Sequence, residues 1–514
     1  MKTRLSSGPA DKRFLIVSFA TYDITEAIYA KAIEELGYEA YILSGYNPFL
    51  KNIFDIFGIN KLFFYEEFNK NFSFAKIRKE AESLVRNATR EELFNLRKDG
   101  VNIGKYAISS IMRTTRSSSF TLKEPNIKKN LSEELAKSIL ALNSAGAMID
   151  KIRPDLLFVI DRGYTPVGQI FDICLNRGIS VIQRCGSHKS GHEILKRYFY
   201  PSMGSSHHHS LSKDSWEIIK NMSWHETLWQ VLYDELRSTY LSGDWFSEVG
   251  TQFKKRLYSK EEIFLKLGID PSKKVAIIFP HMFWDATFFW GKDLFNDYYD
   301  WFVRTLEVAV QNKNMNWIIK IHPANIIKAK RDHYYGEHKE LLAVHETIGR
   351  LPDHMKVISP ESDINTFSLF EIMNYCLTVR GTIGIEASAM GIATLTAGTG
   401  RYDGLGFTYD FNSREEYLQC IQNLENLPAM TKGMIEIARR FAYGIFILRP
   451  LHLDLLDHGY NQDEKGSMRF RPLFRNREDF EKSHFVKGMR EFVESNKEDY
   501  LNLDRLEKCA ELSH

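Results

Sequence analysis

Short apolar runs of strand length alternate with helical patterns in the first part of the chain. Residues 13–19 form such a run, a helical pattern follows over 24–36, and a second run covers 39–45. Two further runs, at 156–160 and 179–185, flank another helical pattern. Because strands that alternate with helices usually pair in parallel, this pattern predicts a doubly wound α/β domain with inserted helices.

The same alternation returns in the second half of the chain. It begins at Ser259 and Glu262, whose spacing is typical of a capping box at the start of a helix. Further runs of strand length follow at 275–280, 316–323, 356–360, 375–379 and 393–398. Helical patterns between them predict a second Rossmann-like domain. No strand is predicted over 186–258, and the residues from 431 onward are predicted to be helical.

Two Rossmann-like domains that face a common cleft make up the fold called GT-B, here with a helical insertion and a helical C-terminal tail. The predicted division is 1–258 for the first domain, 259–430 for the second and 431–514 for a tail that packs back on the lobes. Ligands of such sheets bind at the carboxyl ends of the strands. The residues at the strand ends are therefore the candidates for function.

Composition and charge exclude several classes of function. Lys and Arg number 68 and Asp and Glu 66, so the net charge of +2 gives no reason to expect a nucleic-acid partner. The five cysteines include no CxxC pair, which is typical of reduced thiols in a cytoplasmic protein. No stretch reaches the roughly 18 apolar residues of a membrane span. A cytoplasmic location is expected, and peripheral contact with the inner face of the membrane stays open.

The segment after the strand at 375–379 is the strongest candidate site. Arg380 and Gly381 form a turn and Thr382 begins a helix, whose N–H groups and positive end favour a phosphate. Glu386 lies one turn further along and could accept hydrogen bonds from a ribose diol. The alternative interpretation is an ordinary capped helix with a solvated glutamate.

Two more strand ends are assigned to a donor nucleotide. Lys320 and His322 lie on the same side of the predicted strand, and an imidazole at its end can donate to phosphate. Gly400 and Arg401 belong to a glycine-rich loop that could close on a ligand. A surface histidine and a plain turn are the competing interpretations.

The segment 280–295 follows the first strand of the second domain and is unusually aromatic. His281, Trp284 and Asp285 are its candidates for contact with a sugar or an acceptor. The aromatic residues could equally belong to the core, and the sequence leaves both interpretations open.

A general base for an acceptor hydroxyl is expected on the first domain, opposite the nucleotide. Asp161 is the preferred candidate, and Asp23 and His188 also follow predicted strands. Each of the three could instead be a turn residue or a helix cap.

Missing motifs narrow the chemistry further. The chain has no Asp-x-Asp, so the metal-dependent diphosphate clamp is absent, and it has neither a P-loop nor a GxGxxG after a strand. No metal and no cofactor are therefore expected. His207, His208 and His209 could bind a metal, but a solvated stretch is the preferred interpretation in a serine-rich loop.

Four segments carry a resemblance to a known family. They are KIHPAN (320–325), SPESDINTFSLFEI (359–372), VRGTIGIEASAMGIATLTAGTGRYDGLGF (379–407) and PHMFWDATFFWGKDLF (280–295). At these residues the chain resembles the bacterial capsule polysaccharide biosynthesis proteins, GT-B glycosyltransferases that use nucleotide sugars. The resemblance is specific over about 275–425 and weak in the first domain. It implies that His322, which Pro323 follows, and Thr382 hold the nucleotide phosphates.

The resulting hypothesis is a metal-independent glycosyltransferase that moves a sugar from a nucleotide-sugar donor to a surface or capsular polysaccharide or a glycolipid. The donor is expected on the second domain and the acceptor on the first. A sugar-nucleotide 2-epimerase of the same fold and a non-catalytic polysaccharide-assembly protein are the alternatives. The long aromatic segment 186–258 favours an acceptor over the epimerase.

Overall fold

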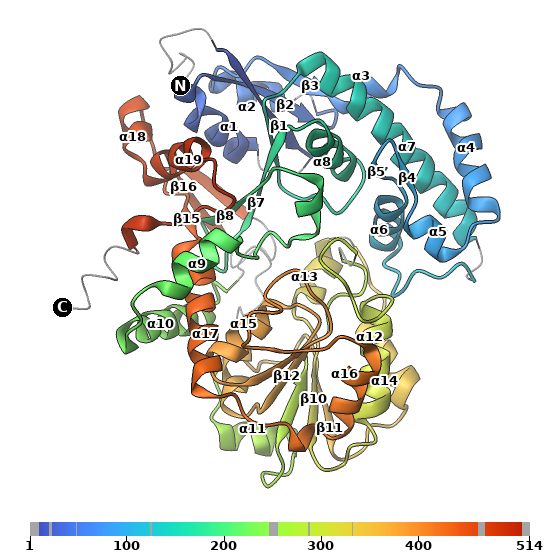
Figure 1. Ribbon diagram of the computed structural model, residues 1–514, viewed down its shortest axis with the longest axis vertical. Coiled ribbons are helices and arrows are strands. Elements are labelled where there is room, and N and C mark those ends of the chain that lie inside the picture. Colours follow the sequence, from blue (N-terminus) through green and yellow to red (C-terminus); the bar gives the residue numbers. More distant parts are fainter. Residues whose placement is uncertain are drawn as a thin grey trace.

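Two lobes, one above the other in Figure 1, make up the protein, and each is built around a sheet with helices on its faces. The structure is a computed structural model that describes residues 10–19, 23–47, 49–123, 126–245, 255–285, 288–331, 333–460 and 468–505. The strand order of both sheets shows the predicted GT-B fold of two Rossmann-like domains.

A seven-stranded sheet forms the first lobe, in the order β15-β8-β7-β6-β1-β2-β3. The five strands β7, β6, β1, β2 and β3 are parallel to one another. At the other end of the sheet, β8 lies antiparallel to β7, and β15 lies antiparallel to β8. The strands are β1 (Lys12–Ser18), β2 (Tyr38–Ser44), β3 (Leu62–Phe64), β6 (Leu156–Val159), β7 (Ser180–Gly186), β8 (His192–Tyr198) and β15 (Leu451–His452).

Helices cover both faces of this sheet because its central strands are apolar on both sides. Leu15 and Val17 of β1 pack toward α4, α6 and α7, whereas Phe14 and Ile16 pack toward α1 and α19. The helices, with one short hairpin, are α1 (Asp23–Ala32), α2 (Leu50–Ile56), α3 (Tyr65–Asn69), α4 (Phe74–Arg86), α5 (Arg90–Phe94), β4 (Arg97–Lys98), β5 (Val101–Asn102), α6 (Gly104–Thr115), α7 (Ile127–Ile152) and α8 (Val167–Asn176).

The second lobe holds a parallel six-stranded sheet in the order β11-β10-β9-β12-β13-β14. Its strands are β9 (Val275–Ile278), β10 (Asn316–Lys320), β11 (Met355–Ile358), β12 (Tyr375–Thr378), β13 (Ala393–Thr396) and β14 (Tyr409–Asp410). Its helices are α11 (Lys260–Leu267), α12 (Tyr298–Ala309), α13 (Ala324–Arg331), α14 (Lys339–Ile348), α15 (Thr382–Ala389) and α16 (Arg414–Gln422). Ser259 and Glu262 form the predicted capping box of α11.

The prediction that 186–258 holds no strand is wrong, because β8 lies within it. Its charged side chains hid the strand pattern, since they are buried and paired rather than solvated. Glu193 accepts a hydrogen bond from Arg184 at 2.7 Å, and the Nζ of Lys196 lies 3.1 Å from a carboxylate oxygen of Asp499. These partners come from a neighbouring strand and from the far end of the chain.

The tail begins with a helix on the second lobe, then returns to the first lobe, and is not wholly helical. It holds the expected helices α17 (Lys432–Tyr443), α18 (Arg477–Lys482) and α19 (His484–Ser495), but also β15 and the hairpin of β16 (Leu456–Tyr460) and β17 (Met468–Pro472). In the other direction, α9 (Lys213–Asn221) and α10 (Glu226–Ser242) pack into the core of the second lobe. Helices on the far side of both predicted boundaries thus pack in the second lobe, namely α9 and α10 before residue 258 and α17 after residue 430.

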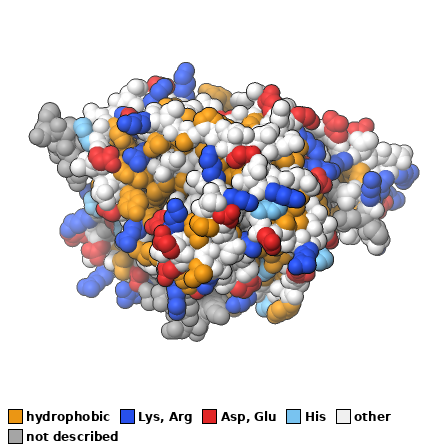
Figure 2. All heavy atoms as spheres, turned by 90° about the horizontal axis from the view of Figure 1, so that it is seen from below, with side chains coloured by type: hydrophobic (Ala, Val, Ile, Leu, Met, Phe, Trp, Pro, Cys, Tyr) orange, Lys and Arg blue, Asp and Glu red, His pale blue; other side chains and the backbone are white. Residues whose placement is uncertain are grey.

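The surface carries charges of both signs. On the face seen in Figure 2, Lys and Arg side chains alternate with Asp and Glu, and apolar groups lie between them. Among the described residues, no helix has the length and apolar character that crossing a bilayer requires.

Candidate active site

The turn between β12 and α15 has the geometry of an anion site. Gly381 precedes the helix, and its N–H donates to the Thr378 Oγ1 at 3.1 Å. A Cβ at this glycine would come within 2.8 Å of the same Oγ1, so a larger residue would disturb the turn. Thr382 opens α15 and is half-buried. The N–H groups of the first turn of a helix have no partner within it, and the positive end of the helix favours an anion.

Arg401 supports this turn from below. Its guanidinium donates to the backbone oxygen of Arg380 at 3.0 Å and to the Thr382 hydroxyl at 2.8 Å. Burial lowers the pKa of Arg401 to about 10. The neighbouring Gly400 lies against the backbone of Gly291, where a Cβ would meet the Gly291 nitrogen at 2.6 Å. Both predicted donor residues of this loop thus shape the turn in the structure.

The Arg380 side chain lies beneath the same turn. It is buried and forms an ion pair with Asp293, in the segment between β9 and α12. Burial raises the pKa of Asp293 to about 6, although Arg380 opposes this shift. Asp293 therefore balances most of the charge of Arg380, and the ion pair holds this turn against the segment between β9 and α12.

Glu386 faces away from the open end of the helix. Its carboxylate is buried and accepts a hydrogen bond from the Tyr240 hydroxyl at 2.5 Å. Burial raises the pKa of Glu386 to about 8. The helical spacing does place this residue one turn below Thr382, as predicted, but α10 covers the position in the folded protein.

His281 joins this site from the loop after β9. Its ring stacks on Tyr298 at 4.3 Å, and its Nε2 lies 3.4 Å from the backbone nitrogen of Arg380 and 3.3 Å from the Thr378 Oγ1. Burial, together with Arg380, lowers the pKa of His281 to about 3. The ring is therefore neutral, and it accepts at Nε2 because a backbone N–H can only donate.

His322 lies beside His281 and is exposed to solvent. Its Nδ1 accepts from the backbone nitrogen of Ala324 at 3.1 Å, so the neutral ring carries its proton on Nε2. The surrounding protein lowers the pKa of His322 to about 4, and Lys328 and Lys320 act in the same direction. Lys320 itself does not join the site, because its buried ammonium group donates to the backbone oxygen of Ile321.

Five side chains from both lobes meet in front of His322. Asp285 accepts from the Tyr164 hydroxyl at 2.8 Å and from the Lys328 ammonium at 2.6 Å. Arg113 stacks over the Tyr164 ring at 4.4 Å and lies 3.9 Å from Asp285 and 3.8 Å from Asp161. Burial alone would raise the pKa of Asp285, but Lys328 and Arg113 hold it at about 2.

Three members of this cluster, Arg113, Tyr164 and Lys328, were not predicted from the sequence. Tyr164 could have been predicted, because it lies in the same turn after β6 as the candidate Asp161. Arg113 and Lys328 lie within helices that showed no motif, and only the packing of the lobes brings them to the cluster.

Asp161 is the candidate base that lies in this cluster, 3.8 Å from Arg113. Its side chain is 55% exposed, and its Oδ1 accepts from the Gly163 N–H at 3.0 Å. The surrounding protein raises the pKa of Asp161, while the Gly163 N–H and Arg113 oppose the shift. A carboxylate with a raised pKa and an open side is suited to accept a proton.

Of the other two candidate bases, His188 is not brought to this cluster. His188 is buried, with Nε2 2.7 Å from Glu235 and Nδ1 3.0 Å from the Ser187 hydroxyl. Burial lowers its pKa, although Glu235 opposes the shift. Asp23 is the first residue of α1, and its side chain lies outside the described residues.

Trp284 is buried in the core of the first lobe rather than open to a sugar. Arg116 and Lys328 lie over its ring at 4.9 and 5.2 Å. Phe288 of the same loop packs edge-on against Phe94 at 5.0 Å. The aromatic residues of this segment are thus core, which was one of the two interpretations of the sequence. Trp284 and Phe288, however, belong to the core of the first lobe, although the segment follows a strand of the second lobe.

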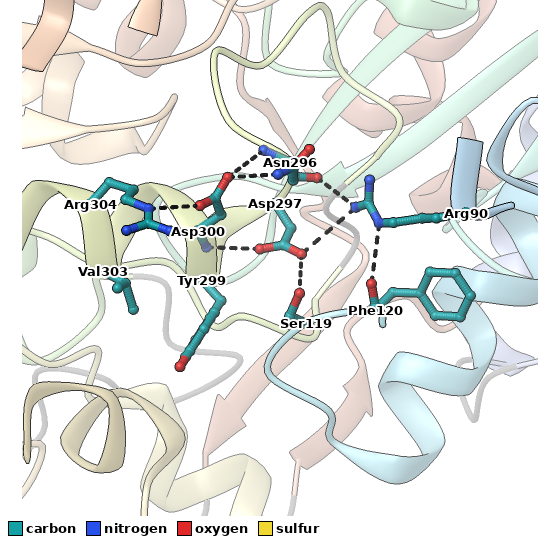
Figure 3. A pocket seen from close by; sticks show the side chains of 9 residues that line it. All are labelled: Arg90, Ser119, Phe120, Asn296, Asp297, Tyr299, Asp300, Val303 and Arg304. Carbon is teal, nitrogen blue, oxygen red and sulfur yellow. Dashed lines mark hydrogen bonds and ion pairs between the residues drawn. The ribbon is translucent and has the colours of Figure 1, made fainter. Parts of the chain in front are cut away.

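A second seam joins the lobes at the pocket drawn in Figure 3. Asp297 caps α12 and also accepts from the Ser119 hydroxyl of the first lobe at 2.5 Å. Arg90 donates to the backbone oxygen of Asn296 at 3.1 Å, and the pocket between these groups has a volume of about 290 Å³. Polar and apolar contacts therefore both hold the two lobes together.

The three consecutive histidines are not the solvated stretch that the sequence favoured. His207 stacks on His208, His209 meets both rings edge-on, and His207 and His209 are buried. Ring nitrogens of His208 and His209 and the Cys185 thiol lie within 4.8 Å of one another, close enough to hold a metal ion. Arg401 lies 3.0 Å from the Nδ1 of His209 and can only donate, so Nε2 keeps its proton. That tautomer does not fit a metal ligand.

No protein-family model and no curated protein sequence matches the chain. Among solved structures, the Kdo 2,4 transferase of Thermosulfurimonas dismutans KpsC is 13% identical, with 61% of this chain and 84% of that chain covered and a TM-score of 0.34. The Kdo 2,7 transferase of the same protein is 11% identical, with coverages of 69% and 89% and a TM-score of 0.34. A UDP-GlcNAc 2-epimerase from Neisseria meningitidis is 11% identical, with coverages of 84% and 95% and a TM-score of 0.28. Because these TM-scores are low, the GT-B fold is assigned from the strand order of the two sheets and not from these similarities.

Proposed function

We propose that the protein is a glycosyltransferase that moves a sugar from a nucleotide-sugar donor to a hydroxyl of a polysaccharide or glycolipid acceptor. One observation carries the proposal. The start of α15, with its buried arginines, belongs to the second lobe, and the exposed Asp161 belongs to the first lobe. The Tyr164–Asp285 hydrogen bond, which joins the turn that holds Asp161 to the loop after β9, supports the assignment of both regions to one site.

The donor diphosphate binds at the start of α15 in this proposal. The first N–H groups of the helix and the Thr382 hydroxyl contact its oxygens, and His322 donates from Nε2. As the bond between the sugar and the phosphate breaks, negative charge develops on the leaving phosphate. Fixed donors stabilise such charge without reorganisation, which lowers the barrier.

Asp161 acts as the general base. Its carboxylate takes the proton of the acceptor hydroxyl while that oxygen forms the new bond to the sugar. Arg113 lies near Asp161 and keeps its carboxylate oriented toward the cleft. The protein groups named here neutralise the leaving phosphate, so the reaction proceeds without a metal ion. The acceptor class, a surface or capsular polysaccharide, follows the sequence resemblance.

Incubation with a panel of nucleotide sugars in the absence of acceptor tests the proposal. Slow hydrolysis of one donor, unchanged by EDTA, is expected of a transferase whose acceptor is water. Conversion of the donor to its C2 epimer would instead identify a 2-epimerase. Binding of no nucleotide would favour an assembly protein, and loss of hydrolysis in EDTA with rescue by Mn²⁺ would refute the metal-independent site.

A further inference from the structure

Aromatic side chains gather at the carboxyl ends of β1, β2 and β3, which lie side by side in the first lobe (Figure 1). Phe19 directly follows β1 and is 39% exposed, and Tyr46 follows β2 and is 70% exposed. Phe64 ends β3, and Tyr65 comes next. We call these four residues the aromatic edge. Exposed apolar side chains are ordinary when they are scattered singly, but a contiguous patch of them marks a binding surface.

The strand order places this edge beside the strand that precedes Asp161. Ser18 pairs with Ser44, and Ser44 pairs with Phe64, so Phe19 and Tyr65 each directly follow a paired residue. On the other side of β1 lies β6, whose last residue paired with β1 is Phe158, three positions before Asp161. Because the carboxyl ends of parallel strands meet at one edge of a sheet, Asp161 and the aromatic edge lie on the same edge. Neighbouring strands are about 4.8 Å apart, so the row of strand ends from β6 to β3 spans about 14 Å.

The rings hold one another in place. Phe19 meets Tyr65 edge-on at 5.7 Å, and Tyr46 meets Phe64 edge-on at 5.2 Å. Phe19 passes over β2 at Gly45, where a Cβ would lie 3.7 Å from the Phe19 ring, an ordinary contact distance. Each of the two pairs is therefore held by its own ring contact, and Phe19 and Tyr46 keep exposed ring area.

The chemistry of the edge fits sugar rings better than a lipid surface. A pyranose presents C–H groups on its faces, which pack on aromatic rings, and hydroxyls at its rim, which need polar neighbours. Asn47, Glu66 and Glu67 are exposed beside the edge and offer such neighbours. Two carboxylates at this place oppose binding to an anionic membrane, which attracts basic segments.

We propose that the aromatic edge binds the acceptor as an extended glycan whose terminal hydroxyl reaches Asp161. This inference rests on the proposed transferase function, because Asp161 defines the reacting end. Its new content is the location and the class of the ligand, namely linked sugar rings lying across β1, β2 and β3. The row is long enough for more than one ring, so affinity rises with the length of the glycan.

Binding of oligosaccharides of defined length tests this inference without any need for turnover. The probes are cello-, chito- and malto-oligosaccharides, each as the disaccharide and the pentaose, measured by saturation-transfer difference NMR and calorimetry. The wild type is expected to bind at least one pentaose more tightly than its disaccharide. The double variant Phe19→Ala/Tyr46→Ala should bind that pentaose at least about tenfold more weakly, the loss of about 1.4 kcal/mol.

Two controls separate folding and location from loss of binding. Tyr335→Ala removes an aromatic ring that is 89% exposed on the second lobe and should leave glycan affinity unchanged. Tyr46→Ala alone removes a mostly exposed ring, so it serves as the variant that folds if the double variant does not. Thermal melting of each variant reports on the fold.

Three outcomes would overturn the inference. They are equal pentaose affinity in the double variant and the wild type, no binding of any pentaose to the wild type, and flotation with phosphatidylglycerol vesicles that the double variant loses. The last outcome would assign the edge to a membrane. Nucleotide binding and donor hydrolysis, measured separately on the wild type, report on the proposed function, so the two failures are distinguishable.

Discussion

At the scale of single residues, Asp161 differs from the buried acids of the protein because its side chain is 55% exposed. We expect Asp161→Asn to reduce turnover by roughly 10²–10⁴-fold, the range for loss of a general base, without a change in melting temperature. Because the base must be ionised, wild-type activity should fall as the pH drops through a pKa above that of an ordinary aspartate. Steady-state kinetics over pH 4–9 measure both effects.

Asp150→Asn is the matched control for this prediction. Its side chain is 70% exposed on α7 and pairs only with Arg177 at the surface. The control should keep wild-type kinetics. Near-normal turnover in Asp161→Asn would move the base to another residue.

Glu386 allows a prediction about stability. Its folded pKa of about 8 lies above the usual glutamate value, so the native state binds an extra proton and loses stability as the pH rises toward 8. Glu386→Gln removes that ionisation, and the variant should melt at a higher temperature than the wild type at pH 9 but not at pH 5. Differential scanning calorimetry at the two pH values checks this.

The same variant tests the ribose role that the sequence suggested for Glu386. Because the carboxylate faces Tyr240, nucleotide affinity should be unchanged in Glu386→Gln. Nucleotide affinity reduced tenfold or more would instead show that the carboxylate turns to the ligand.

At the scale of elements, the start of α15 combines a glycine turn, a helix end and the Thr382 hydroxyl. We expect Thr382→Ala to lower turnover by roughly 10²–10³-fold, the scale for loss of one charge-stabilising donor. Thr382→Ser keeps the hydroxyl that Arg401 contacts and should retain most of the activity. Thr431→Ala removes the cap of α17 and should cost about 1 kcal/mol of stability with little effect on turnover. Equal activity in the alanine and serine variants would contradict the assignment.

At the scale of the whole molecule, the lobes share a core through the loop after β9. Trp284 belongs to the second lobe by sequence but packs in the first-lobe core. Trp284→Ala should therefore lower the free energy of unfolding by roughly 3–5 kcal/mol and separate one thermal transition into two. Leu265→Ala, at a side chain that is 85% exposed, is the control and should change neither. A single transition in the tryptophan variant would mean that other contacts suffice to couple the lobes.

The sequence by itself determined most strands of the two sheets and their order along the chain. Apolar runs bounded by glycine and proline gave β1, β6 and β9–β13, because buried parallel strands are apolar on both faces. Short-range rules also placed the turn at Gly381 and the capping box at Ser259. These features depend on residues a few positions apart, which the order of the side chains specifies directly.

The tertiary structure alone decided where the polar side chains lie. The strand β8 was hidden because Lys196 finds its partner in Asp499, which lies 303 positions further along the chain. Trp284 became first-lobe core and His207 and His209 became buried for the same reason, since each meets side chains from the opposite lobe. Arg113 and Lys328 reach Asp285 only when the two sheets face each other. Burial and charge pairing depend on contacts between distant segments, and no local pattern records those contacts.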